Sequence, residues 1–306
     1  MSSDEQPAIR CDLCGPPIDL GSRGELSIRH AAPGDEAALD ALYGELEPGD
    51  LSKRFFTSGK PSQHFLEGWV GVEARGGLCL LVELTSRDDC RVIAEAGYAP
   101  LSDGDAELGI TVAPGHRGWT GPWLLDVLMA HANDRGVENI QALVKTGNRP
   151  MLDIIRHRGC ARFDDSDWET TRVTMSTDGH TPAWPPESAR PRILIESPRS
   201  RPDTARRARE QGGTILICSG FDQNGSHCPL HEDQRCPLIE GADAVVIDRR
   251  GLDDTDSVRD AVARVHPDAN VTVVNLLSNT ELPDRQEPLD LHLENLHSED
   301  VEDIGP

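Results

Sequence analysis

The sequence predicts a two-domain α/β protein: a mixed, mainly antiparallel sheet with flanking helices, followed by a small parallel α/β domain of the flavodoxin or receiver type. Three observations lead to this fold class. The chain has 306 residues, which is enough for two domains of ordinary size. Its strand-like and helical segments follow one order in the first half and another in the second. A proline-rich segment at residues 177–190 separates the two patterns, and such a segment is stiff and unsuited to the interior of a helix.

The first pattern, in residues 25–176, places helices among strands that are expected to run antiparallel. The helices carry apolar residues at spacings of three and four, as in Leu39, Leu42 and Leu46, and glycine ends the later ones. The strands are rich in Val, Ile and Leu, with turn residues between them. In chain order, this pattern predicts a strand at 25–29, a helix from 33, short helices near 51–56 and after 61, strands at 78–84, 91–98 and 106–112, a helix at 121–135, a strand at 139–145, a helix at 148–158 and a strand around 173.

The second pattern begins after residue 190, where short, continuous apolar strands alternate with helices. This alternation is typical of a parallel sheet. It predicts strands at 192–196, 214–218, 244–248 and 271–276, and helices at 202–211 and 255–265. The predicted organisation is therefore an N-terminal arm at 1–24, a first domain at 25–176, a linker at 177–190, a second domain at 191–280 and an acidic, solvated tail at 281–306.

Charge and hydropathy exclude several functions. The formal net charge of −23 repels phosphate backbones, so nucleic acid is not expected as a partner. The sequence has no apolar run long enough for a membrane span, and its N-terminus lacks the basic and apolar regions of a secretory signal. We therefore expect a cytoplasmic protein without a membrane partner. In that compartment the eight cysteines are expected to be buried thiols or metal ligands rather than disulfides.

The most informative stretch is Ala106–Leu125, which has the pattern of a strand, a glycine-rich turn and the start of a helix. Such a turn can point backbone N–H groups at phosphate oxygens, and the helix dipole adds to the attraction. The stretch is therefore suited to bind a pyrophosphate.

Residues 25–176 resemble the GNAT superfamily of N-acetyltransferases, and three segments carry the resemblance. They are the strand end and turn Val112–Gly118, the helix Leu124–Gly136 and the helix Asn148–Gly159. Two further segments, Leu51–Phe56 and Ala106-Glu107, are similar to the bacterial branch that acetylates protein lysines. The resemblance implies a domain that binds acetyl-CoA as co-substrate and acetylates a primary amine, with a protein lysine as one candidate acceptor.

The resemblance also assigns roles to residues of this sequence. Glu107 would accept the proton of the attacking amine, because a protonated amine is not a nucleophile. Asn148 would contact the cofactor. The backbone of Ile110, Thr111 and Val112 would hold the pantetheine arm and polarise the thioester, and the pyrophosphate would bind backbone amides of His116, Arg117, Gly118, Trp119, Thr120 and Gly121. Without these roles, Glu107 is a solvated carboxylate and Asn148 is a helix N-cap.

The turn departs from the family pattern, and this leaves a second function open. At least one glycine of the family's pyrophosphate loop is missing, and Trp119, Pro122 and Trp123 are bulky or lack an N–H group. One hypothesis is an acetyl-CoA-dependent N-acetyltransferase with a C-terminal regulatory domain. The alternative is a catalytically impaired scaffold that senses acyl-CoA or holds a protein partner.

Two groups of cysteines and histidines could bind a metal. Cys11-x-x-Cys14 has half of a zinc-site spacing, and His30 could lie near it. The second group, at and after the end of strand 214–218, consists of Cys218, Cys228, His231 and Cys236. These side chains could bind zinc, the thiolates could hold an iron–sulfur cluster, and Cys228 and Cys236 could form a redox pair that acts as a sensor. The alternative is that two Cys-Pro-Leu repeats anchor a long loop, with their cysteines as small buried hydrophobes.

Overall fold

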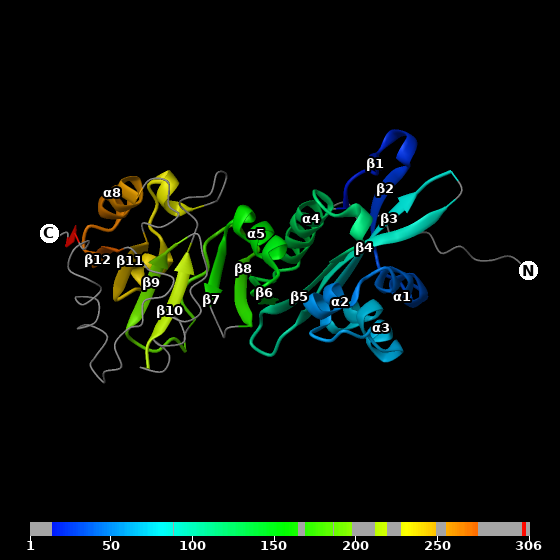
Figure 1. Cartoon of the computed structure of the whole chain (residues 1–306), viewed down its shortest axis with the longest axis horizontal. Helices are drawn as coiled ribbons and strands as arrows, with labels where there is room; N and C mark the ends of the chain where they lie inside the picture. The colour runs from blue at the N-terminus through cyan, green and yellow to red at the C-terminus, as the bar shows by residue number, and fades with distance from the viewer. Residues whose placement is uncertain are drawn as a thin grey trace, which may run out of the picture. The chain divides into compact units, whose positions relative to one another are not determined.

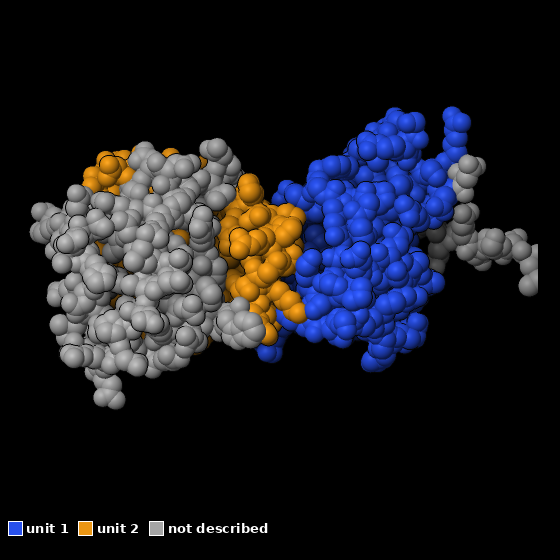
Figure 2. Space-filling model, viewed as in Figure 1, with its two compact units in different colours: residues 1–142 blue, residues 143–306 orange. Residues whose placement is uncertain are grey.

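The computed structural model describes residues 14–87, 89–164, 169–185, 187–197, 212–218, 228–248, 255–274 and 302–303. The chain divides into two compact units, residues 1–142 and 143–306, which are distinguished in Figure 2. Their secondary structure is labelled in Figure 1.

None of the helices in the described part of the chain is long and apolar enough to cross a membrane.

The first unit is built on a sheet whose strands follow the order of the sequence. Its strands are β1 (Ile18–Asp19), β2 (Glu25–His30), β3 (Leu78–Thr85), β4 (Cys90–Pro100), β5 (Ala106–Val112) and the first part of β6 (Asn139–Lys145). Every neighbouring pair from β1 to β5 is antiparallel, and β5 pairs with β6 in parallel. The mixed, mainly antiparallel sheet that the sequence predicts is therefore confirmed.

Helices pack against this sheet because each presents an apolar stripe. They are α1 (Glu36–Gly44), α2 (Pro48–Phe55), α3 (Gln63–Val70) and α4 (Thr120–Asp134), with short 3-10 turns η2 (Gly21–Arg23), η3 (Val72–Arg75) and η4 (Pro114–His116). Figure 1 shows α1, α2 and α3 on one side of the strands and α4 on the other. Leu39 and Leu42 of α1 and Leu66 of α3 share one core with Cys79 and Leu81 of β3.

The segment before β2 differs from the irregular arm that the sequence predicts. Strand β1 pairs with β2 through Ile18 and Leu26, and the backbone N–H of Leu20 donates to the carbonyl of Gly24 at 2.8 Å. Gly24 has a φ of 106°, a conformation that other residues rarely adopt. A strand of two residues is too short to give a periodic signal in the sequence. Cys11 lies outside the described residues.

The second unit also contains one sheet, with a parallel centre. Its strands are β7 (Ala161–Asp164), β8 (Thr170–Ser176), β9 (Arg192–Glu196), β10 (Thr214–Cys218), β11 (Ala244–Asp248), β12 (Val271–Val274) and β13 (Glu302–Asp303), and its helices are α5 (Arg149–Arg158), α7 (Pro237–Glu240), α8 (Thr255–Val265) and the 3-10 turn η5 (Pro229–Glu232). Strands β10, β9, β11 and β12 lie in that order and are parallel. The predicted parallel sheet is confirmed, whereas its assignment to the flavodoxin or receiver type stays a prediction.

In the second unit, the predicted helix at 202–211 lies outside the described residues. The predicted tail contributes β13, which pairs antiparallel with β12, so this part of it is not simply solvated.

The predicted linker at 177–190 contains Trp184, whose indole is 7% exposed and whose Nε1–H donates to the carbonyl of Leu238 at 2.7 Å. This part of the linker is therefore packed into the core of the second unit.

Candidate functional site

The pairing of β5 changes along its length. Its whole length, from Ala106 to Val112, pairs with β4. Its pairing with β6 is limited to Ala106 with Ile140 and Glu107 with Gln141. Within the described residues, the β6-facing edge of β5 beyond Glu107 is therefore not used for sheet pairing with β6. An extended ligand can use such an edge through main-chain hydrogen bonds.

The turn after β5 leads directly into helix α4. Gly118 has a φ of 106°, which a glycine tolerates, and α4 begins at Thr120. The backbone amides of Gly118, Trp119, Thr120 and Gly121 have no hydrogen-bond acceptor in the described part of the chain. The first amides of a helix lack partners within the helix and favour anions.

Two neighbouring residues reduce the number of amides that the turn can offer to an anion. The amide of His116 is already used, because it donates to the carbonyl of Ala113 at 2.9 Å. Pro122, in the first turn of α4, has no N–H to offer. Of the amides expected to bind from His116 to Gly121, that of His116 is therefore already occupied. The role of the others in binding stays a prediction.

Side chains from other elements surround the turn. Arg117 donates from Nη2 to Asp50 Oδ2 of α2 at 2.7 Å, and Arg91 Nη2 lies 3.2 Å from His116 Nε2. Burial and the charge of Arg91 lower the pKa of His116. Burial opposes ionisation of Asp50, but its hydrogen bonds with Arg117 and Lys53 hold its pKa below the ordinary value. Arg117 of the turn and Arg91 of β4 therefore place two guanidinium groups at the turn of a strongly acidic protein.

The two tryptophans of the turn lie beside each other. The ring centroids of Trp119 and Trp123 are 5.5 Å apart, and Trp119 is 51% exposed. A large apolar side chain that remains in water at the start of α4 is available to a ligand, and it can also obstruct one.

Glu107 lies on the face of β5 that is covered by α1, α2 and α3. Side chains alternate along a strand, so Glu107, Gly109 and Thr111 share one face. The side chain of Glu107 is exposed and makes no hydrogen bond or ion pair with the described residues. The Glu107 carboxylate is therefore accessible to a molecule in solution.

A second carboxylate on this face is fully buried. Glu95 of β4 is 0% exposed and lies directly across from Thr111. It accepts four hydrogen bonds, from Tyr43 Oη at 3.2 Å, Arg54 Nε at 3.2 Å, Thr111 Oγ1 at 2.8 Å and Trp69 Nε1 at 3.0 Å. We call these five residues the Glu95 cluster. Its donors come from α1, α2, α3 and β5, so it joins all three helices to the sheet.

The Glu95 cluster packs against a part of the sheet where two facing residues are glycines. Gly97 of β4 lies opposite Gly109 of β5. A Cβ atom at Gly109 would lie 2.7 Å from Arg54 Cζ, and one at Gly97 would lie 2.8 Å from Trp69 Cζ2. Real Cβ atoms do not approach other atoms this closely, so both glycines are needed for Arg54 and Trp69 to lie flat on the sheet.

The chemistry of the two carboxylates differs. Both carboxylate oxygens of Glu95 accept from buried donors, one of them a guanidinium, whereas Glu107 is exposed. Glu95 is therefore suited to hold the helices in place. Burial and the charge of Glu95 raise the pKa of Tyr43 well above its ordinary value, so Tyr43 stays a hydroxyl donor.

Asn148 belongs to the second unit, where it directly precedes α5. Its backbone N–H donates to the carbonyl of Lys145 at 2.8 Å, and its own carbonyl accepts from Leu152 at 3.2 Å. It occupies the N-cap position, but its side chain makes no cap hydrogen bond. The predicted contact of Asn148 with a cofactor stays a prediction.

The cysteines of the second unit are placed in its core rather than in a ligand cluster. Cys228 and Cys236 are 8% and 3% exposed and pack with Leu230 and Leu238, whereas His231 is exposed. Burial raises the pKa of the Cys228 thiol to about 12 and that of Cys236 to about 11. Among the described residues, the candidates Cys218, Cys228, His231 and Cys236 do not form a group of metal ligands. The alternative interpretation, in which the Cys-Pro-Leu repeats anchor the loop, fits this packing.

The second unit has a buried carboxylate of its own. Glu196 ends β9 at the carboxyl edge of the parallel sheet and is 3% exposed. Burial raises its pKa to about 7, although a hydrogen bond with Cys218 acts in the opposite direction. Open parallel sheets commonly bind ligands at this edge.

Comparison with known proteins gives similarity of structure only. No protein-family model and no curated protein sequence matches the chain. The chain is similar to the GNAT domain of PAT from S. lividans, with 20% identity and a TM-score of 0.46 over 52% of this chain and 96% of that one. It is also similar to a ribosomal-protein-alanine N-acetyltransferase from Brucella melitensis (22%, TM-score 0.39, 48% and 96%) and to a spermidine N-acetyltransferase from Vibrio cholerae solved with CoA and spermine (15%, TM-score 0.41, 52% and 98%). Each similarity covers about half of this chain.

Proposed function

We propose that the protein is an acetyl-CoA-dependent N-acetyltransferase that acts on a primary amine. The observation that carries the proposal is the end of β5. There, pairing with β6 stops at Glu107 while the strand continues to Val112 and enters a turn whose amides at the start of α4 have no acceptor among the described residues. This arrangement offers a strand edge that can bind an extended chain and a group of amides that can bind a phosphate. Coenzyme A contains both, as its pantetheine arm and its pyrophosphate.

The cofactor would bind along this path. The backbone of Ile110–Val112 would take main-chain hydrogen bonds from the pantetheine arm. The pyrophosphate would bind the amides of Gly118–Gly121, where the helix dipole of α4 favours negative charge. Arg91 and Arg117 would offset the repulsion between an anionic cofactor and a chain with a net charge of −23.

The transfer itself would be a single displacement. The amine nitrogen attacks the thioester carbonyl carbon, the new C–N bond forms, the C–S bond breaks, and coenzyme A leaves as the thiolate, which takes up the proton that the nitrogen loses as the amide forms. The amine must first lose a proton, and Glu107 would receive it directly or through one water. The exposure of Glu107 and its lack of partners among the described residues support this role. A lysine side chain of a protein is the first acceptor to test, and the second unit is proposed to regulate the first.

A calorimetric titration with acetyl-CoA, followed by a CoA-release assay on small amines and lysine peptides, tests this function. We expect binding with a micromolar Kd and measurable release of CoA. Glu107→Gln should keep the Kd and lower kcat/KM by about 10²-fold or more. Glu25→Gln, which changes an exposed carboxylate on β2, is the matched control and should change neither quantity. Full turnover by Glu107→Gln would remove Glu107 as the base, and no binding at millimolar acetyl-CoA would refute the proposal.

The crowded turn favours a second candidate function, a scaffold that binds acyl-CoA without turnover. Trp119 is half exposed beside Trp123, the amide of His116 is occupied, and Pro122 offers none. Binding of acetyl-CoA without transfer to any amine of the panel would support this function. If Trp119 is the obstacle, Trp119→Ala should then bind acetyl-CoA more tightly than the natural protein does.

A further inference from the structure

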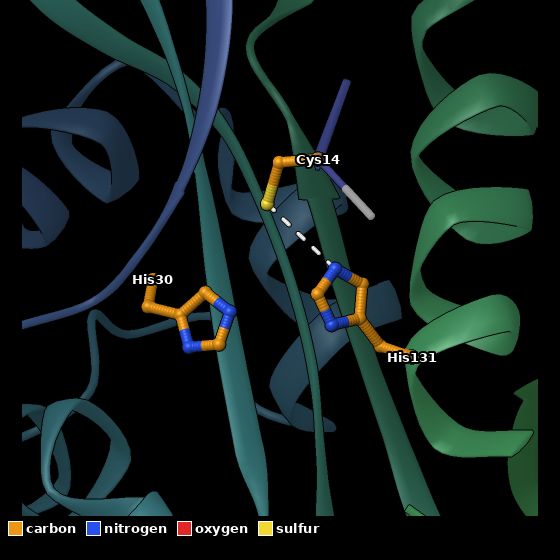
Figure 3. A group of neighbouring side chains, drawn as sticks. All are labelled: Cys14, His30 and His131. Carbon is orange, nitrogen blue, oxygen red and sulfur yellow. Dashed lines mark hydrogen bonds between the residues drawn. The ribbon is translucent and has the colours of Figure 1, made fainter. Parts of the chain in front are cut away.

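Three side chains from separate parts of the first unit meet beneath its surface. Cys14 precedes β1, His30 ends β2 and His131 lies in α4; Figure 3 shows their thiol and two imidazoles grouped together. One ligand atom of each lies within 4.8 Å of the others, and Cys14 Sγ is 3.6 Å from His131 Nε2. The two imidazole rings meet edge to face, with centroids 5.4 Å apart.

The three residues are poorly accessible to water. Cys14 is 7% exposed and His131 is 3% exposed, and the side chain of His30 is 15% exposed. The thiol and the two imidazoles therefore face one another within the first unit rather than the solvent.

The orientation of His30 is fixed from outside the group. Its Nδ1 lies 2.7 Å from Glu73 Oε1 of η3, so this nitrogen faces the carboxylate. Its Nε2 is buried and has no hydrogen-bond partner in the described part of the chain. A carboxylate behind an imidazole whose other nitrogen is unpaired is the usual arrangement around a protein-bound zinc ion.

We propose that Cys14, His30 and His131 bind one zinc ion. A thiolate with two imidazoles is a ligand set that zinc prefers. In a tetrahedral zinc site, neighbouring ligand atoms lie about 3.3–3.6 Å apart. The separation of 3.6 Å between Cys14 Sγ and His131 Nε2 fits this distance, and the 4.8 Å limit on the others leaves a closing movement of about 1 Å. Binding displaces the proton of the Cys14 thiol, which leaves to solvent.

The site would be structural, because Cys14 and His131 are buried, His30 is half-buried, and the three come from separate parts of the first unit. The ion would tie the segment before β1 to β2 and α4. A tetrahedral zinc ion takes four ligands, and the described residues supply three of them.

Metal analysis of the full-length protein tests the site. Mass spectrometry of the protein as purified should find about one zinc ion per chain, and protein stripped by a chelator should take up one zinc or cobalt ion. The cobalt form should show a thiolate-to-metal charge-transfer band. Cys14→Ser and His131→Gln should each abolish the band and the zinc. Cys90→Ser and His64→Gln change an exposed thiol and an exposed imidazole of the same unit and should keep both.

Two further variants separate this site from its alternatives. Glu73→Gln should weaken zinc binding by about 10- to 100-fold without removing a ligand. Glu67→Gln, an exposed change on α3, is its control. The double variant Cys228→Ser and Cys236→Ser should keep the zinc. The proposal is overturned if stripped protein with a native circular dichroism spectrum takes up no metal, if Cys14→Ser keeps the zinc, or if only the double variant loses it. None of these results depends on acetyl transfer.

Discussion

Replacing Glu95 with Gln should strongly destabilise the first unit. The variant keeps the size of the side chain but removes the only charge that balances Arg54 within the Glu95 cluster. The side chain of Arg54 is 16% exposed, so water cannot replace the lost partner fully. Breaking a buried ion pair by removing one partner costs about 3–5 kcal/mol. We expect the free energy of unfolding to fall by that amount.

The hydrogen bonds of the cluster support the same magnitude. A glutamine can accept at one oxygen only, whereas Glu95 accepts on both, from Trp69 on Oε2 and from the other donors on Oε1. At least one buried donor is left unsatisfied, at about 1–3 kcal/mol. Arg54→Met should cost a similar amount. The double variant Arg54→Met with Glu95→Gln should cost about 0.5–3 kcal/mol less than the sum of the single changes, because it leaves no unpaired charge.

Urea unfolding followed by circular dichroism measures these losses, and hydrogen exchange in β4 and β5 locates them in the first unit. Glu45→Gln is the matched control, because the side chain of Glu45 is 40% exposed and pairs with Arg91 at 3.1 Å. An exposed pair of this kind is worth about 0–1 kcal/mol. The reasoning is refuted if Glu95→Gln loses no more than Glu45→Gln, or if the double variant shows no coupling.

Three further predictions concern other positions. Burial raises the pKa of Glu196 from its ordinary 4.5 to about 7, so the contribution of this group to stability is greatest below pH 4.5 and is lost as pH rises through about 7; urea unfolding between pH 5 and 8 should show a fall of up to about 3 kcal/mol that Glu196→Gln removes. Gly109→Ala should displace Arg54 and lower the melting temperature by several degrees, for a cost of about 1–3 kcal/mol, whereas Gly115→Ala, which meets open space, should not. Trp184→Phe leaves the carbonyl of Leu238 without its donor and should cost about 1–3 kcal/mol in urea unfolding.

Regular elements were predictable because their signals are local. Strands β5, β6, β9, β10 and β11 begin and end where the sequence predicts, since each is a short apolar run between turn residues. Strand β7 was not predicted; four residues with one buried phenylalanine, Phe163, carry too little pattern.

The Glu95 cluster shows why a site that spans distant segments was harder to predict. Its members lie far apart in the sequence, and only the fold brings them together. One signal was present: a single acidic residue, Glu95, stands inside the apolar strand that continues to Tyr98. A charge at such a position is rarely buried without a partner. The partner, Arg54, could not be inferred, because helical periodicity does not say which helix covers which strand.

The position of His131 could have been predicted more easily, from helical periodicity alone. It lies seven residues after Leu124 and three after Leu128, so it falls on the buried stripe of α4. A histidine on an apolar stripe needs a polar partner. The sequence allows His30 to lie near Cys14, but it does not connect His131 with them, because that contact joins residues 117 positions apart.

The roles of Glu95 and Glu107 can be distinguished by experiment, because stability should depend on Glu95 and turnover on Glu107. Glu95 is held by four donors, so its removal should disturb the fold. Glu107 is exposed and has no partner among the described residues, so Glu107→Gln should change the free energy of unfolding by no more than about 0.5 kcal/mol. If it acts as the base, the same change lowers kcat/KM. Both variants should be assayed well below their melting temperatures. If Glu95→Gln lowers turnover and alters its pH profile while Glu107→Gln is fully active, the base is Glu95 and not Glu107.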